Sequence, residues 1–202
     1  MTTPKFAIFL LIAPLAAHAR SIAKPHHTLA VCVDNDYNYL DRWGLGQALT
    51  IVSGIFEKIA LDVEWRHSST ECPAEGIRVT ISYETKEALA SGELAWANPH
   101  DRTVRLFYHR ILLRDSNSGT PFVLAHVLAH EITHVLQGTP RHSSSGIMKA
   151  HWTLADLARM RVLPLGFTDE DTELINRGLD RQPQNSLAVQ SSAILDATIA
   201  DR

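Results

Sequence analysis

The residues best suited to catalysis or metal binding lie within one stretch of five, HEITH, at His130, Glu131 and His134. Two residues four positions apart on a helix lie one turn apart on the same face, with Cβ atoms about 5–6 Å apart. Their imidazoles can therefore bind one zinc ion. Glu131 lies beside that face and can accept a proton from water, whose pKa zinc lowers to about 7. The stretch predicts a zinc site in which Glu131 is a general base.

The helix predicted around HEITH runs from Thr120 to Gln137 and is apolar on almost every side, which is typical of a buried helix. Buried histidine and glutamate side chains are destabilising unless they have partners. One metal ion gives all three a partner. We expect Thr120 to cap the helix, Pro121 to occupy its first position and Gly138 to end it in a left-handed turn.

A catalytic zinc site has three protein ligands and leaves one position for water, so a third ligand is expected beyond HEITH. His142 follows His134 by eight residues, and a chain that turns at Gly138 can bring it back to the metal. Glu170 or Glu173, on a later predicted helix, stays open as an alternative third ligand.

His126 lies four residues before His130 and extends the row of histidines. A straight helix drifts over eight residues, and three consecutive turns do not enclose a tetrahedral metal well. We therefore interpret His126 as a core residue or as a support for a ligand.

The segment HEITHVLQGTPRHSSSGIM resembles the metzincin zinc peptidases, which have the pattern HExxHxxGxxH followed by a methionine turn beneath the metal. Seven residues separate the second and third histidines where the usual pattern has five, and the glycine comes four residues after the second histidine instead of three. The resemblance thus implies an enlarged loop before the third ligand. The residues that it matches are the ligands His130, His134 and His142, the base Glu131, the helix-ending Gly138 and the turn methionine Met148.

Apolar periodicity predicts the elements that must position this site. The predicted strands are Thr28–Val33, Leu61–Arg66, Ile77–Tyr83, Leu94–Ala97 and Thr103–His109, and the predicted helices are Leu45–Ala60, Thr120–Gln137, Thr153–Met160 and Thr168–Leu179. The last two helices begin with Thr-x-x-Asp, which is similar to a capping box. The order predicts an α/β (α+β) fold with one mixed, mostly parallel sheet backed by helices, a buried zinc-binding helix and a helical C-terminal part.

The same order of elements resembles the zincin-like catalytic half of the metzincins. In that family, the strand before the last one lies at the edge of the sheet and pairs with an extended substrate. The resemblance gives this role to Leu94–Ala97 and implies a zinc-dependent metalloendopeptidase. Strand addition of this kind relies on backbone hydrogen bonds, so it works for many peptide sequences.

Residues 1–19 have the features of a secretory signal peptide: Lys5, a short apolar run, and the small-residue site Ala17-His18-Ala19. We expect a catalytic domain over residues 20–182 and a polar, mobile tail over 183–202. Export to the periplasm or outside the cell makes Cys32 and Cys72 candidates for a disulfide. No membrane association is expected once the signal is removed.

The net charge of −3 gives no electrostatic support to a nucleic-acid partner. A peptide or protein substrate is the partner that a zinc hydrolase of this kind implies. A second interpretation stays open, in which the chain is an exported binding module that zinc only stabilises. Glu131 argues against it, because a structural zinc site needs no base.

Overall fold

The five strands form one mixed sheet in the computed structural model, which describes residues 27–35, 42–67, 72–82, 92–114 and 119–181. The strands are β1 (His27–Asn35), β2 (Leu61–Arg66), β3 (Ile77–Ser82), β4 (Ala95–Asn98) and β5 (Thr103–Phe107). Their order is β2-β1-β3-β5-β4, and only the β4–β5 pair is antiparallel in this described sheet. The predicted mixed, mostly parallel sheet is confirmed, and the strand predicted at its edge lies there.

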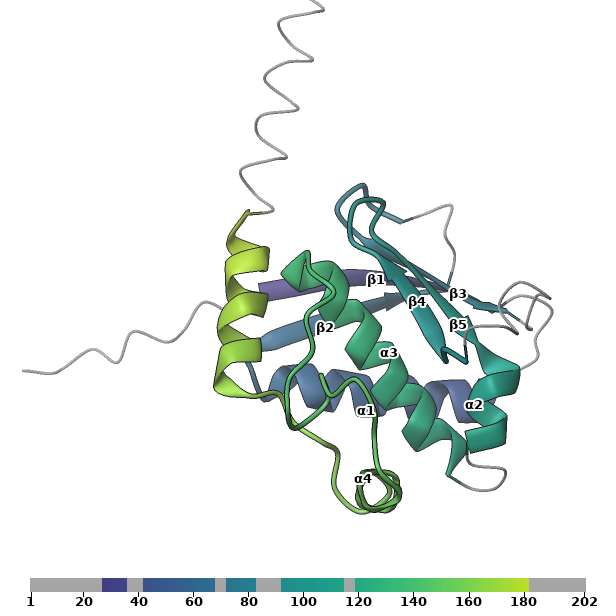
Figure 1. The fold of residues 1–202 in the computed structure, drawn as a ribbon. Helices are drawn as coiled ribbons and strands as arrows, with labels where there is room; N and C mark the ends of the chain where they lie inside the picture. Colours follow the sequence, from purple (N-terminus) through teal and green to yellow (C-terminus); the bar gives the residue numbers. More distant parts are fainter. Residues whose placement is uncertain (1–26, 36–41, 68–71, 83–91, 115–118, 182–202) are drawn as a thin grey trace, which may run out of the picture.

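Alternation of side chains decides which face of the sheet is buried. In β3, Ile77, Val79 and Ile81 are buried and the residues between them are half-buried. Two helices, α1 (Arg42–Glu57) and α3 (Thr120–Gln137), pack against each other and against the sheet (Figure 1). Leu49, Val52, Ile55 and Phe56 of α1 are buried. The helix begins and ends three residues earlier than predicted.

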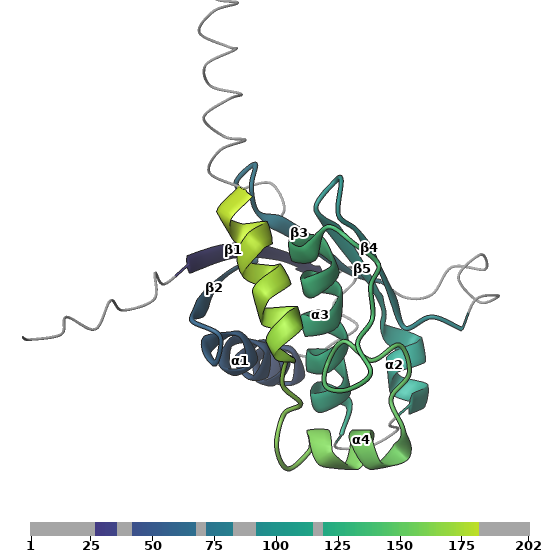
Figure 2. The ribbon, with the colours of Figure 1, turned by 60° about the vertical axis from the view of Figure 1, so that its left-hand side comes forward.

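Helix α3 is buried almost all round, as the sequence predicts: sixteen of its 18 residues are buried. A further helix, residues 169–181, packs beside it (Figure 2). The contact is so close that a Cβ atom on Gly178 would lie 1.8 Å from the carbonyl oxygen of Leu136. Gly138 ends α3 at a φ of 69°, and its N–H donates to the carbonyl of His134. This is the predicted left-handed end, which favours glycine.

Three local predictions were wrong. Thr120 does not cap α3, because it is already the first helical residue and is buried. Pro121 is therefore the second helical residue and not the first. Gly119 precedes the helix, and its carbonyl accepts the N–H groups of Phe122 and Val123. The strand predicted to reach His109 ends at Phe107, and α2 (Tyr108–Arg114) begins there. Tyr108 and Ile111 are both buried, so a helical spacing of three replaces the alternation.

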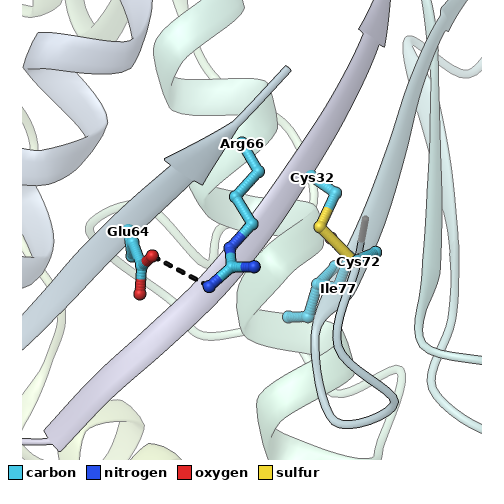
Figure 3. Close-up of a disulfide and its surroundings, with 5 residues drawn as sticks. All are labelled: Cys32, Glu64, Arg66, Cys72 and Ile77. Carbon is cyan, nitrogen blue, oxygen red and sulfur yellow. Dashed lines mark hydrogen bonds and ion pairs between the residues drawn. A yellow bond between two sulfur atoms is a disulfide. The ribbon is translucent and has the colours of Figure 1, made fainter. Parts of the chain in front are cut away.

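A disulfide joins Cys32, on β1, to Cys72, which precedes β3 (Figure 3). Their Cα atoms are 5.7 Å apart and the loop spans 40 positions of sequence. The disulfide lies near Arg66 on β2, and the guanidinium of Arg66 donates a hydrogen bond to the carboxylate of Glu64 at 2.9 Å. Within the described residues, no helix has the length and apolar character to cross a membrane. The predicted signal peptide and the predicted tail lie outside the described residues.

Both predicted capping boxes are present. Thr153 caps α4 (Leu154–Met160), where Asp156 returns a hydrogen bond to the backbone N–H of Thr153. Thr168 and Asp171 exchange the same pair of bonds at the start of helix 169–181. Each cap therefore fixes the residue at which its helix begins.

Candidate metal centre

Three histidines, two from α3 and one from the loop after it, meet where α3 lines a pocket. The ring nitrogens that His130, His134 and His142 can offer to a metal all lie within 4.8 Å of one another. The ring centroids are 4.6 Å apart for His130 and His134, and His142 lies 5.3 and 5.0 Å from them. The enlarged loop therefore returns the third histidine to the helix.

The two helical imidazoles are held so that their Nε2 atoms face each other. Nδ1 of His130 donates to the carbonyl of Ile147 at 2.9 Å, and Nδ1 of His134 donates to the carbonyl of Thr139 at 3.0 Å. With both protons on Nδ1, the Nε2 atoms have only lone pairs, yet they lie 2.9 Å apart. Two nitrogens on a tetrahedral zinc at about 2.05 Å would be ~3.3 Å apart. The donor set therefore fits a metal ion, which can accept both lone pairs.

Burial keeps these imidazoles neutral. It lowers the pKa of His130 to about 4, against the opposing effect of its bond to the Ile147 carbonyl. Burial also lowers the pKa of His134. A neutral imidazole is the form that binds metal, so the lowered pKa values favour the metal-binding form of His130 and His134 at neutral pH.

Glu131 lies on the same helix and lines the pocket that contains the three histidines. Burial, and to a smaller extent the negative charge of Glu93, raises the pKa of Glu131 to about 7. A carboxyl group with a pKa near the working pH can both take and return a proton. The arrangement thus places an acid–base group next to a metal-binding set.

The pocket has a volume of about 710 Å³ and runs between the edge strand and the loop after Met148. Leu94, Ala95, Trp96 and Ala97 line one side. Trp152 and Leu157 line the other, together with the exposed His151. The edge strand therefore lines the same pocket as the histidines and Glu131.

The loop that carries His142 is anchored on both sides of that histidine by one buried carboxylate. Asp171, which is fully buried, accepts hydrogen bonds at Oδ1 from Arg141 at 2.8 Å and from Ser143 at 2.6 Å. Its Oδ2 accepts the two capping bonds from Thr168, at 3.0 and 2.7 Å. Burial raises the pKa of Asp171, but the bonds from Ser143, Thr168 and Arg141 outweigh it and the net pKa is lowered.

Met148 follows the loop that carries His142 and is fully buried. Its carbonyl accepts the N–H of Ser143 at 2.7 Å, which ties the turn to the residue after His142. Gly146 has a φ of 74° in the same turn, a conformation that favours glycine. The loop and the turn therefore hold each other in place through backbone bonds.

Neither alternative third ligand is favoured by its position. Glu170 forms an ion pair with Arg141, and Glu173 forms one with Arg177 at 3.3 Å. His126 is fully buried away from the three histidines and makes two hydrogen bonds of its own, which agrees with its interpretation as a core residue.

Sequence reasoning missed three groups that shape the site. Asp171 was recognised only as a helix cap, because its Oδ1 partners lie 28 and 30 residues away. Arg110, in the unpredicted helix α2, donates to the carbonyl of Glu93 at 2.7 Å and so fixes the start of the edge strand. Trp152 packs edge-on against His130 with ring centroids 5.8 Å apart. Only the aromatic residue close after Met148 offered a sequence signal.

Comparison with known proteins gives a fold but no sequence family. No protein-family model matches the chain, and no curated protein matches it. Among solved structures, the chain is similar to the crystal structure of an archaemetzincin from Methanopyrus kandleri, with a TM-score of 0.54 and 15% sequence identity. The likeness covers 79% of this chain and 99% of that one. The protein therefore has the fold of that archaemetzincin, and on it three imidazoles converge beside a half-buried glutamate.

Proposed function

We propose that this chain is a zinc-dependent metalloendopeptidase, with His130, His134 and His142 as ligands and Glu131 as general base. The observation that carries the proposal is the pair of Nε2 lone pairs that face each other at 2.9 Å beside Glu131. The similarity of the fold to that of an archaemetzincin supports the proposal, because the name of that protein agrees with the metzincin resemblance of residues 130–148.

Zinc held by three imidazoles supplies a Lewis acid and lowers the pKa of water to about 7. Glu131 takes a proton from the attacking water and delivers it to the amine that leaves. The raised pKa of Glu131 suits both steps, since the group is neither a strong acid nor permanently protonated near neutral pH. The neutral ligands and the low-polarity pocket strengthen the charge interactions at the carbonyl.

The substrate in this proposal is an extended peptide that lies along β4. Backbone groups of residues 94–97 bind it as an added strand, which aligns one peptide bond with Glu131. Met148 supports the loop that carries His142 through its carbonyl bond to Ser143. Gly138 ends α3 just after His134 and lets the chain turn towards that loop. The protein acts outside the cytoplasm, in keeping with its disulfide and its signal-like N-terminus.

The test compares the parent protein with Glu131→Gln and with His142→Ala, each measured for bound zinc and for cleavage of a broad peptide library. Glu131→Gln should retain stoichiometric zinc and lose about 10²–10⁴-fold in cleavage rate, the usual contribution of a general base. His142→Ala should lose zinc as well as activity. Glu173→Ala is the matched control, and it should change neither quantity.

Two results would overturn the proposal. A parent protein that holds zinc but cleaves no peptide would replace it with the zinc-stabilised binding module. Loss of zinc in Glu173→Ala but not in His142→Ala would replace the third ligand.

A further inference from the structure

His126 is the one histidine of α3 that does not line the pocket, yet it is completely buried. Its Nδ1 lies 2.7 Å from the carbonyl oxygen of Phe122, and its Nε2 lies 3.0 Å from the backbone nitrogen of Leu165. Because the amide of Leu165 can only donate, Nε2 must be the acceptor and Nδ1 must carry the proton. Burial lowers the pKa of His126 and keeps this neutral form.

The segment that His126 holds is connected to the first metal ligand. Gly166, next to Leu165, accepts the N–H of Ile147 at 3.0 Å through its carbonyl. The carbonyl of the same Ile147 accepts Nδ1–H of His130 at 2.9 Å. A continuous path of three hydrogen bonds thus leaves α3 at His126 and returns to α3 one turn later at His130.

The two loops on this path have little room to shift. A Cβ atom on Gly146 would lie 2.4 Å from the carbonyl oxygen of Gly166, so the loops meet backbone to backbone. Ile147 and Leu165 are both buried. The separation between Leu165 and α3 therefore sets where the Ile147 carbonyl lies, and that carbonyl orients the ring of His130.

A second contact joins the same two histidines from the side. The indole ring of Trp152 packs edge-on against His126, at 6.3 Å between centroids, and against His130, at 5.8 Å. Trp152 lines the pocket. A change at His126 therefore reaches the ligand through packing as well as through hydrogen bonds.

We propose that His126 is a positioning residue for the metal ligand His130, acting through the backbone of Leu165–Gly166 and Ile147. This inference rests on the zinc site proposed above. His126 holds no metal and touches no substrate. The Nε2 atom of His126 holds Leu165, and the Gly166 carbonyl next to it holds Ile147. The carbonyl of Ile147 then orients the ring of His130, as hydrogen bonds from outside the ligand set do for many metal ligands.

Two substitutions separate the two nitrogens of His126. Gln places its amide group near the position of Nε2 and can still accept from Leu165, whereas Asn reaches only the position of Nδ1 and keeps the bond to Phe122. Each variant is titrated with Zn²⁺ against a chromophoric chelator, and the visible spectrum of its Co²⁺ form is recorded. His126→Asn should weaken Zn²⁺ binding about tenfold and change the Co²⁺ spectrum. His126→Gln should stay within about threefold of the parent, with the parental spectrum.

Leu128→Ala is the control for a general loss of stability, because Leu128 is fully buried on α3 and is not on the path. It should unfold more easily than the parent and still bind Zn²⁺ with parental affinity. Equal zinc affinity and spectra in the parent and in His126→Asn, or an equal loss in Asn and Gln, would overturn the inference. A parent protein that binds no Zn²⁺ would instead refute the proposed function.

The parent protein provides a check that needs no folded variant. Long-range ¹H–¹⁵N spectra of the imidazole rings report which nitrogen of His126 carries the proton. The proposal requires the Nδ1–H tautomer, and a proton on Nε2 would contradict it.

Discussion

The loop with His142 is the part of the site most open to a decisive test, because one carboxylate holds both neighbours of that histidine. Replacement of Asp171 by Ala removes two bonds at Oδ1, from Arg141 and Ser143, and two at Oδ2, from Thr168. Replacement of Thr168 by Ala removes only the side-chain bonds of the cap. The pair of variants therefore separates the anchoring of the loop from the capping of the helix.

The magnitudes follow from these bonds. Asp171 is fully buried and charged, and hydrogen bonds to a charged group contribute roughly 1.5–3 kcal/mol each without being additive. Removing one partner of a buried ion pair typically costs 3–5 kcal/mol, so we expect about 4 kcal/mol for Asp171→Ala. Loss of an N-terminal cap costs about 1 kcal/mol, which is the value expected for Thr168→Ala.

The assay measures stability and metal binding separately. Urea unfolding of the metal-free proteins gives the free energies of unfolding, and competition with a chromophoric chelator gives the zinc affinities. Asp171→Ala should weaken zinc binding about 10–100-fold, since His142 loses its fixed loop. Thr168→Ala should bind zinc as the parent does.

Either of two outcomes would refute this reasoning. Parental zinc affinity in a destabilised Asp171→Ala protein would mean that other contacts position His142. An equal loss of zinc affinity in both variants would mean that the effect passes through the end of helix 169–181 and not through Oδ1.

Two further predictions concern packing and pH. Gly178→Ala should destabilise the protein by about 3 kcal/mol or more in urea unfolding, because its Cβ would meet the carbonyl of Leu136 at 1.8 Å. Gly54→Ala, in α1 with nothing within 4 Å of its Cβ, should instead stabilise by about 0.5–1 kcal/mol; equal effects would contradict the close contact. The pKa of His130 is lowered to about 4 in the folded, metal-free protein, so its contribution to stability is present above pH ~6.5 and is lost as the pH falls towards about 4, by about 3 kcal/mol in total. Urea unfolding between these pH values should show the slope, and His130→Asn should reduce it; an unchanged slope in that variant would assign the effect to other groups.

Much of the fold could be predicted because local patterns carry it. The alternation of Ile77, Val79 and Ile81 selects one face of a strand. The all-round apolar character of Thr120–Gln137 indicates a buried helix. The change from strand to helix at Tyr108 was not predictable. Tyr108 and His109 continue the alternation of the preceding strand, and the same two residues also fit the first turn of a helix.

What the sequence alone determined about this protein is the pair of helical histidines with Glu131 beside them. The reason is that the period of an α-helix places residues four apart on one face whatever surrounds it. The position of His142 is of another kind. Seven intervening residues allow many paths, and the one that is taken depends on Asp171, on the turn at Gly146 and on the segment held by His126. The bonds made by Asp171 to Ser143 and by His126 to Leu165 join residues 28 and 39 positions apart, so only the packing of the whole chain could decide them.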